Sequence, residues 1–136
     1  TPAGEAFEKR LITLYDGVNA LLDEFRPDAA AIEKLYFKQN VTTGISVAQA
    51  RGVIALAAAQ RGLPIGEFGP VEVKNGVVGY GKAAKGQVQD MLKILLNLEK
   101  KPTPDDAADG LALAICQLRV PAYLWTPENP TKGDRP

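Results

Sequence analysis

The run Ala29-Ala30-Ala31-Ile32-Glu33 decides the fold class, because it reads as a strand and not as a helix. The run follows Pro27-Asp28 and ends at an acid, so it is too short for an independent helix. Short apolar runs of this kind are typical of a central strand that is buried on both faces. A carboxylate at the carboxyl end of such a strand points into the crevice where α/β proteins place their ligands. Glu33 is therefore a candidate site residue, and the alternative is a strand-end residue that merely turns to solvent.

Helical patterns lie on both sides of this strand. Apolar residues recur at intervals of three and four from Phe7 to Phe25, which predicts a helix. Small and aliphatic residues predict a second helix over residues 44–61, followed by a short strand around Ile65–Phe68. We expect a glycine-rich turn at 76–81, a third helix over 84–98, and a fourth that runs to about Leu118 with Thr103 as its N-cap.

Strands that alternate with helices indicate an α/β fold. A chain of 136 residues, 46% apolar and 24% charged, fits one globular domain. We expect that domain to span residues 1–120, with residues 121–136 as a proline-rich extension that lacks an apolar period. Two short strands are too few for a stable sheet, so we expect further strands of the sheet to lie outside these residues.

The composition excludes several kinds of site. The sequence contains no histidine and a single cysteine, Cys116, so it has no disulfide framework, no histidine-containing zinc site and no Ser-His or Cys-His nucleophile. Catalysis must use carboxylates, lysines or a hard metal ion. The longest apolar run, around Val53 to Ala59, is far too short to span a membrane, and no basic-then-apolar leader opens the chain. We therefore expect a cytoplasmic protein that makes no membrane contact.

The charges are unevenly distributed, although the formal net charge is zero. Residues 31–101 hold ten bases and five acids, whereas acids outnumber bases in the segments on either side. A basic centre beside a carboxylate cluster suits an enzyme that acts on a phosphate backbone. The alternative is a set of ordinary solvated helix faces.

Asp106 and Asp109 are three residues apart, so both lie on one face near the start of the fourth expected helix. Like charges at this spacing repel each other unless a cation lies between them. Asp106 has an ordinary explanation, because an acid in the first turn complements the helix dipole. The helix dipole explains Asp109 less well, because Asp109 lies beyond the first turn. It also stands beside Gly110, and both residue types are unfavourable within a helix. Oxygen ligands without histidine select Mg²⁺ or Mn²⁺, and carboxylate-held Mg²⁺ is typical of phosphodiester hydrolysis.

Several blocks, taken in order, resemble the RuvC family of Holliday junction resolvases. They extend over most of the chain and comprise Ala31-Ile32-Glu33, Leu35-Tyr36-Phe37-Lys38-Gln39-Asn40, Gln49-Ala50-Arg51-Gly52, Val73-Lys74-Asn75-Gly76-Val77-Val78-Gly79-Tyr80-Gly81, Lys85-Gly86-Gln87-Val88-Gln89 and Asp105-Asp106-Ala107-Ala108-Asp109-Gly110-Leu111-Ala112. The resemblance implies an RNase H-like fold, with a mixed sheet flanked by helices. It also implies a homodimer, paired Mg²⁺-dependent nicking of four-way DNA junctions in recombination and repair, and cooperation with the RuvA-RuvB branch-migration complex.

The resemblance also implies roles for individual residues. The family's strand-end glutamate corresponds to Glu33 and its helix aspartates to Asp106 and Asp109, all three as catalytic metal ligands, because the D-A-A-D pattern selects Asp106 over Asp105. Two catalytic lysines near the scissile phosphate correspond to Lys74 and Lys85. DNA contacts are expected from Tyr36, Phe37, Lys38, Asn40 and Lys82. The rings of Tyr36 and Phe37 could stack on exposed bases or belong to the core.

The family's opening β-hairpin, which carries an aspartate in a Gly-Ile-Asp-Pro-Gly type motif, has no counterpart in this sequence. We expect Thr1 to correspond to a point after that hairpin, in the retained part of a longer chain. The alternative is a shortened form that cannot complete the metal site and acts as a non-catalytic junction-binding module.

A second alternative is a nucleotide-binding P-loop, because residues 76–82 fit the pattern G-x-x-x-x-G-K. The next residue is Ala83, where a P-loop needs a hydroxyl to ligate Mg²⁺, and no apolar strand precedes Gly76. The resolvase interpretation is therefore preferred. The helix expected over 44–61 is apolar or small on nearly every face, which predicts that it contributes to a two-fold interface.

Overall fold

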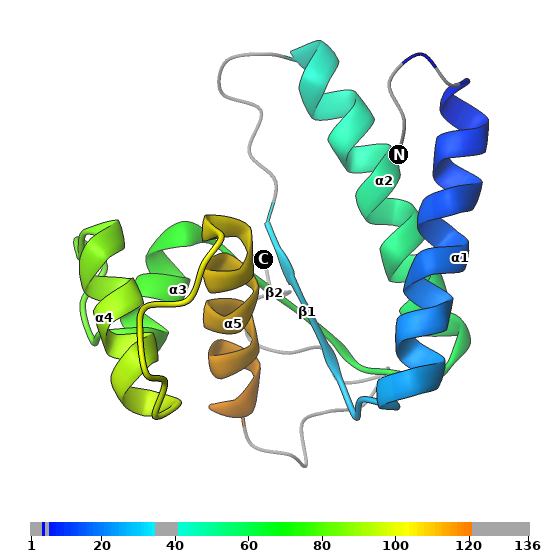
Figure 1. Ribbon diagram of the computed structural model, residues 1–136. Helices are drawn as coiled ribbons and strands as arrows, with labels where there is room; N and C mark the ends of the chain where they lie inside the picture. Colours follow the sequence, from blue (N-terminus) through cyan, green and yellow to red (C-terminus); the bar gives the residue numbers. More distant parts are fainter. Residues whose placement is uncertain (1–3, 5, 35–40, 121–136) are drawn as a thin grey trace.

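The computed structural model describes residues 4, 6–34 and 41–120, with backbone only at 41–43 (Figure 1). Within this part of the chain, helices cover a two-stranded sheet. The elements are, in order, α1 (Phe7–Phe25), β1 (Ala30–Glu33), α2 (Val41–Gln60), β2 (Ile65–Phe68), α3 (Pro70–Val77), α4 (Lys85–Leu95) and α5 (Asp105–Leu118). Figure 1 shows α1 and α2 on one side of the sheet and α3, α4 and α5 on the other. The expected α/β arrangement is therefore present.

The sheet pairs β1 and β2 in parallel, with Ala30 opposite Ile65 and Glu33 opposite Phe68. The backbone N–H of Lys34 donates to the carbonyl of Phe68 at 3.1 Å and extends the pairing past the end of β1. Parallel strands need a crossover connection, and α2 supplies it. The carboxyl ends of both strands consequently lie at the same edge of the sheet, and Glu33 lies at that edge.

The guanidinium of Arg61, the residue that follows α2, forms hydrogen bonds to α1. It donates to the Asp23 carboxylate at 2.7 Å and to both the side-chain and backbone oxygens of Asn19 at 3.1 Å. Helix α1 ends as expected at Phe25, because Arg26 adopts a left-handed conformation (φ 44°) and Pro27 follows.

The main core lies between α3, α4 and α5. Its buried members are Val77, Leu92, Ala108 and Ala112, and partly buried side chains such as Val73 and Ile115 pack against them. Ala108 and Ala112 are short side chains on α5, so α3 and α4 can approach α5 closely at these two positions. This packing places the amino-terminal turns of α3 and α4 beside the middle of α5.

Helix α3 corrects the sequence analysis, which placed no helix at 70–77 and a glycine-rich turn at 76–81. Residues Gly76 and Val77 belong to α3, and only the residues after them form a turn. The helix begins with a proline, and the Glu72 carboxylate accepts the backbone N–H of Gly69 at 3.1 Å as in a capping box. Because a helix and not a strand precedes the turn, the P-loop alternative is not supported.

Three helix boundaries also differ from expectation. Helix α2 begins at Val41 instead of residue 44 and ends at Gln60. Helix α4 ends at Leu95, because Asn97 takes a left-handed conformation (φ 53°) and stops the apolar period before Leu98. Helix α5 begins at Asp105 with Pro104 as its N-cap, so the prediction of Thr103 as the N-cap is wrong.

The expected extension at 121–136 lies outside the described residues. No helix in the described part of the chain is long and apolar enough to cross a membrane.

Candidate active site

One pocket lies at the carboxyl end of β1, between α3, α4 and α5. Its volume is about 280 Å³. Four of its lining side chains are charged, namely Glu33, Lys74, Lys85 and Asp109, and each comes from a different element. Pro70, Val73, Val88, Ala112 and Leu113 form the remaining wall. The tertiary structure therefore gathers charged groups from four separated segments around one cavity.

The two carboxylates reach the pocket from two different elements, β1 and α5. Glu33 is the last residue of β1, where the strand direction carries it past the edge of the sheet. Asp109 lies on α5 on the same face as Ala112 and Leu113, three and four residues later, which also line the pocket. Asp106 is an exposed residue of the first turn and is not among the lining residues. The structure thus brings together Glu33 and Asp109 and leaves Asp106 at the margin.

The two lysines come from the helices that face α5. Lys74 is half-buried in the middle of α3, whereas Lys85 is the first residue of α4 and is exposed. Lys85 Nζ donates to Asp105 Oδ2 at 3.1 Å. This hydrogen bond and the charge of Asp105 raise the pKa of Lys85, and the charges of Asp109 and Asp106 act in the same direction. The same contact lowers the pKa of Asp105, so both groups are charged at neutral pH.

A second ion pair connects β1 to α3. Lys34, which follows Glu33, places its Nζ 3.3 Å from Glu72 Oε1. The same carboxylate oxygen accepts the backbone N–H of Gly69 and so caps the helix that carries Lys74. Glu72 therefore links the strand end that carries Glu33 to the start of the helix that carries Lys74.

The donor chemistry of the pocket fits a hard cation. The acidic side chains that line it are those of Glu33 and Asp109, and neither histidine nor cysteine lines it. Within the described ranges, no three His, Cys, Asp or Glu side chains are close enough together to hold a metal ion. The two lysines add positive charge that suits a phosphate group.

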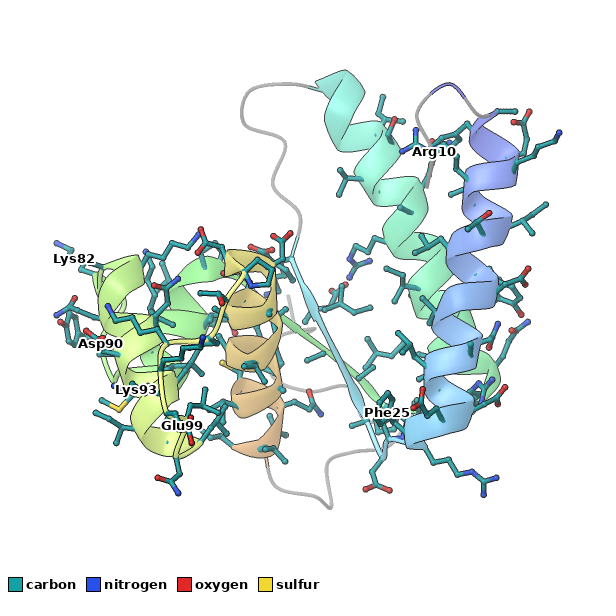
Figure 2. The ribbon with its side chains drawn as sticks, viewed as in Figure 1. Arg10, Phe25, Lys82, Asp90, Lys93 and Glu99 are labelled. Atoms are coloured by element: carbon teal, nitrogen blue, oxygen red, sulfur yellow. The ribbon has the colours of Figure 1, made fainter. Side chains whose placement is uncertain are left out.

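The remaining expected site residues comprise four that the structure does not describe, and Lys82. Tyr36, Phe37, Lys38 and Asn40 lie outside the described residues. Lys82 is exposed on the turn before α4 and lies on the outer side of that helix in Figure 2, and it does not line the pocket.

Sequence reasoning missed the supporting residues of the site. The part of the apolar wall formed by Pro70 and Val73 was not expected, because helix α3 was not expected. The signal that could have revealed it is the proline at the first helical position, with Glu72 three residues after Gly69. Asp105 was set aside in favour of Asp106, and its contact with Lys85 is visible only in three dimensions.

An α/β domain with carboxylates at a strand end and on a neighbouring helix agrees with the class expected from the resemblance, the RNase H-like nucleases. The family model described as crossover junction endodeoxyribonuclease RuvC matches residues 1–117. The chain belongs to this RuvC family.

Individual relatives agree with the family match. The crossover junction endodeoxyribonuclease RuvC of Moorella thermoacetica is 53% identical over 116 residues, which cover 85% of this chain and 70% of that protein. The RuvC of Pseudothermotoga lettingae is 53% identical over 111 residues, which cover 82% of this chain and 68% of that protein.

Solved structures confirm the expected RNase H-like fold. Thermus thermophilus RuvC matches with a TM-score of 0.80 and 33% sequence identity, over 87% of this chain and 71% of that one. The structure of T. thermophilus RuvC in complex with Holliday junction substrate gives a TM-score of 0.82 at 33% identity, over 87% and 72% of the two chains.

Proposed function

We propose that the pocket between β1, α3, α4 and α5 is the catalytic centre of this chain, which is a Holliday junction resolving endonuclease of the RuvC family. One observation carries the proposal. Two carboxylates and two lysines from four separate elements, all expected from the sequence as site residues, line a single cavity. Charged groups of both signs around one pocket suit a reaction in which a phosphodiester enters and negative charge develops on it.

The proposed metal ligands are Glu33 and Asp109, with Asp106 one helical turn before Asp109. Carboxylate oxygens select a hard divalent cation, which we propose to be Mg²⁺ with Mn²⁺ able to substitute. When bound, such a cation supplies Lewis-acid polarisation of the phosphodiester and a more acidic water. Glu33 and Asp109 line the same pocket from β1 and α5, so their carboxylates limit where a phosphate can approach.

The proposed role of Lys74 and Lys85 is to stabilise the phosphate as the P–O bond breaks. Ammonium groups that are fixed beside a phosphate are more effective than mobile ones, because they need little reorganisation in the transition state. The packing of α3 against α5 fixes the backbone that carries Lys74, and the start of α4 fixes the backbone that carries Lys85.

DNA contacts outside the pocket are proposed for Tyr36, Phe37, Lys38, Asn40 and Lys82. The first four lie within seven residues after Glu33 along the chain. Their support is this position and the family resemblance.

We propose a homodimer in which α2 contributes to the two-fold interface. Exposed apolar side chains occur along both helices of the α1–α2 pair, including Ile12, Leu21, Ile45, Val47 and Leu56. A two-fold dimer suits a junction with two symmetric strands to cut. The RuvA-RuvB complex remains a partner proposed from the family resemblance, and a cytoplasmic location is proposed on the same ground.

The test is cleavage of a synthetic four-way junction with each strand labelled in turn. We expect paired nicks with Mg²⁺ or Mn²⁺, none in EDTA, and recovery when metal is added back, while a linear duplex of the same sequence stays intact. Cleavage that continues fully in EDTA would overturn the metal proposal. Junction binding without nicking in either metal would favour the non-catalytic junction-binding module.

A further inference from the structure

Asp105 makes two side-chain contacts that connect α5 to α4. Its Oδ2 accepts a hydrogen bond from Lys85 Nζ at 3.1 Å, and its Oδ1 accepts one from Gln89 Nε2, also at 3.1 Å. Lys85 and Gln89 are four residues apart on α4, so one carboxylate spans a full turn of that helix. Asp105 does not itself line the pocket.

The backbone at Lys85 is fixed, but its long side chain is not. Gln87 accepts the backbone N–H of Ala84 through its side-chain oxygen at 2.7 Å, and its amide donates to the Tyr80 hydroxyl. These contacts hold the first turn of α4. The Lys85 side chain, however, is 58% exposed and would sample many rotamers without a partner.

The position of the Lys85 ammonium matters because other carboxylates lie nearby. Asp109 and Asp106 also attract it electrostatically. An ammonium released from Asp105 would move toward these two carboxylates and compete with a cation for them. Asp105 is therefore in a position to hold Lys85 at the rim of the pocket, where a phosphate can meet it.

We infer that Asp105 is a positioning residue that holds the Lys85 ammonium at the pocket rim for the scissile phosphate, with Gln89 orienting the Asp105 carboxylate. This inference rests on the proposed function, because it assigns a purpose to a contact of the proposed catalytic Lys85. It goes beyond that function, since Asp105 is neither a proposed metal ligand nor a pocket residue.

A purely structural role predicts a different result. Exposed ion pairs contribute little to stability, and α4 offers a matched pair for comparison. Asp90 on α4 lies 3.0 Å from Lys101 Nζ, with a similarly exposed side chain, and both residues are remote from the pocket lining. Asp90→Ala is therefore the control for loss of a surface ion pair on the same helix.

The experiment compares Asp105→Ala, Asp105→Asn, Lys85→Ala, the double variant Asp105→Ala/Lys85→Ala, and Asp90→Ala in the full-length protein. Single-turnover junction cleavage is measured at saturating enzyme, and junction binding is measured in Ca²⁺. We expect Asp105→Ala to lower the cleavage rate about tenfold with binding changed less than about twofold, because misplacement affects the reacting geometry more than capture. Asp105→Asn keeps an acceptor oxygen and should recover part of the rate, and Asp90→Ala should leave it unchanged.

The double variant decides whether Asp105 acts through Lys85. In the Lys85→Ala background, Asp105→Ala should cause no further loss. An equal loss in both backgrounds, or equal losses for Asp105→Ala and Asp90→Ala, would overturn the inference. So would an unchanged rate for Asp105→Ala.

A readout that does not depend on cleavage separates this inference from the proposed function. Acylation of lysines by an amine-reactive ester is mapped by peptide mass spectrometry, and Asp105→Ala should increase labelling of Lys85 and leave Lys101 unchanged. Asp90→Ala should do the reverse. Unchanged labelling of Lys85 would show that Asp105 does not hold the Lys85 ammonium, and this result does not depend on whether the protein cleaves a junction. A second outcome is that labelling changes as expected but Lys85→Ala cleaves at the wild-type rate. In that case the proposed role of Lys85 and the positioning role of Asp105 both fail. The other roles in the proposed function are not affected by this result.

Discussion

Gly76 of α3 and Cys116 of α5 lie so close together that a Cβ added at Gly76 would be only 2.6 Å from the Cys116 Sγ. Gly76 lies within a helix, so it is required by this close approach and not by an unusual backbone conformation. The thiol is buried, and burial raises its pKa, so it packs there as a small neutral group. The contact fixes the distance between α5, which carries Asp109, and α3, which carries Lys74.

Gly76→Ala should therefore destabilise the protein. The new methyl group must displace a buried sulfur, and overpacking of this kind costs about 1–3 kcal/mol. Urea unfolding at equilibrium measures the loss. Gly110→Ala is a suitable control, because an added Cβ there meets no atom within 4 Å.

Removing the sulfur should reverse the effect of that substitution. A Cys116→Ala substitution removes the sulfur and keeps the Cβ of residue 116. That Cβ lies 3.7 Å from the methyl group added at Gly76, which is an ordinary contact distance. Gly76→Ala should then be nearly neutral or stabilising, since alanine favours a helix over glycine by up to about 1 kcal/mol. The same loss in both backgrounds would show that the sulfur contact is not the cause.

Asp109→Asn should abolish cleavage while junction binding stays intact or becomes tighter. The substitution weakens metal capture and also removes a negative charge that repels the phosphate. Binding in Ca²⁺ and cleavage in Mg²⁺ by the same preparation separate the two effects. Asp16→Asn, at an exposed position of α1, serves as the control. If binding and cleavage are lost together, Asp109 is a folding residue.

The two pocket lysines should differ from each other when each is replaced by alanine. Lys85→Ala should slow single-turnover cleavage at saturating enzyme with little change in affinity, which is the pattern of a transition-state contact. Lys74→Ala should give a mixed result, with some loss of affinity and a salt slope reduced by up to about 0.9. Lys93→Ala is the control, because Lys93 is exposed on α4 and does not line the pocket. An unchanged rate for Lys85→Ala would make Lys85 an ordinary solvated residue.

The Asp23–Arg61 pair predicts an acid-dependent loss of stability. Arg61 lowers the pKa of Asp23 from its usual value of 3.8 through a hydrogen bond and through its charge. A group with a lowered folded-state pKa stabilises the fold above its unfolded pKa and loses that contribution as the pH falls through the folded value. Asp23→Asn should therefore be less stable than wild type at about pH 6, and the two stabilities should converge as the pH falls through the lowered folded-state pKa of Asp23. Urea unfolding across this range measures the difference, and a constant gap would contradict the pair's contribution.

The proposed α2 interface predicts that a charge on its exposed face separates the protomers. Leu56 is 51% exposed, and Leu56→Glu should convert a dimer into a monomer at micromolar concentration, as measured by analytical ultracentrifugation. Ile94 is 71% exposed on α4, on the other side of the sheet, so Ile94→Glu should leave the mass unchanged. A monomeric wild-type protein would contradict the proposal.

Local pattern was sufficient for much of this fold. The bounds of α1 and β2 match those expected from apolar spacing, and β1 was found within one residue. Helix α3 was missed because two glycines near its end resemble a turn, whereas its start is set by Gly69, Pro70 and Glu72 acting together. The candidates Glu33, Lys74, Lys85 and Asp109 were all identified from strand-end position, helix-face spacing and family resemblance, and the roles of these residues remain predictions.

The sequence by itself determined the chemistry that is available, because the absence of histidine leaves only carboxylates and lysines for a site of this kind. It also showed that Glu33 and Asp109 occupy positions that do not favour folding by themselves, one at a strand end and one beyond the first turn of a helix. Only the tertiary structure decided that Glu33, Lys74, Lys85 and Asp109 meet in one pocket, that Asp106 stays at its margin, and that Asp105 pairs with Lys85. The physical reason is that strand pairing and helix packing set these distances through contacts between residues far apart in the chain, such as Gly76 and Cys116, which no local pattern contains.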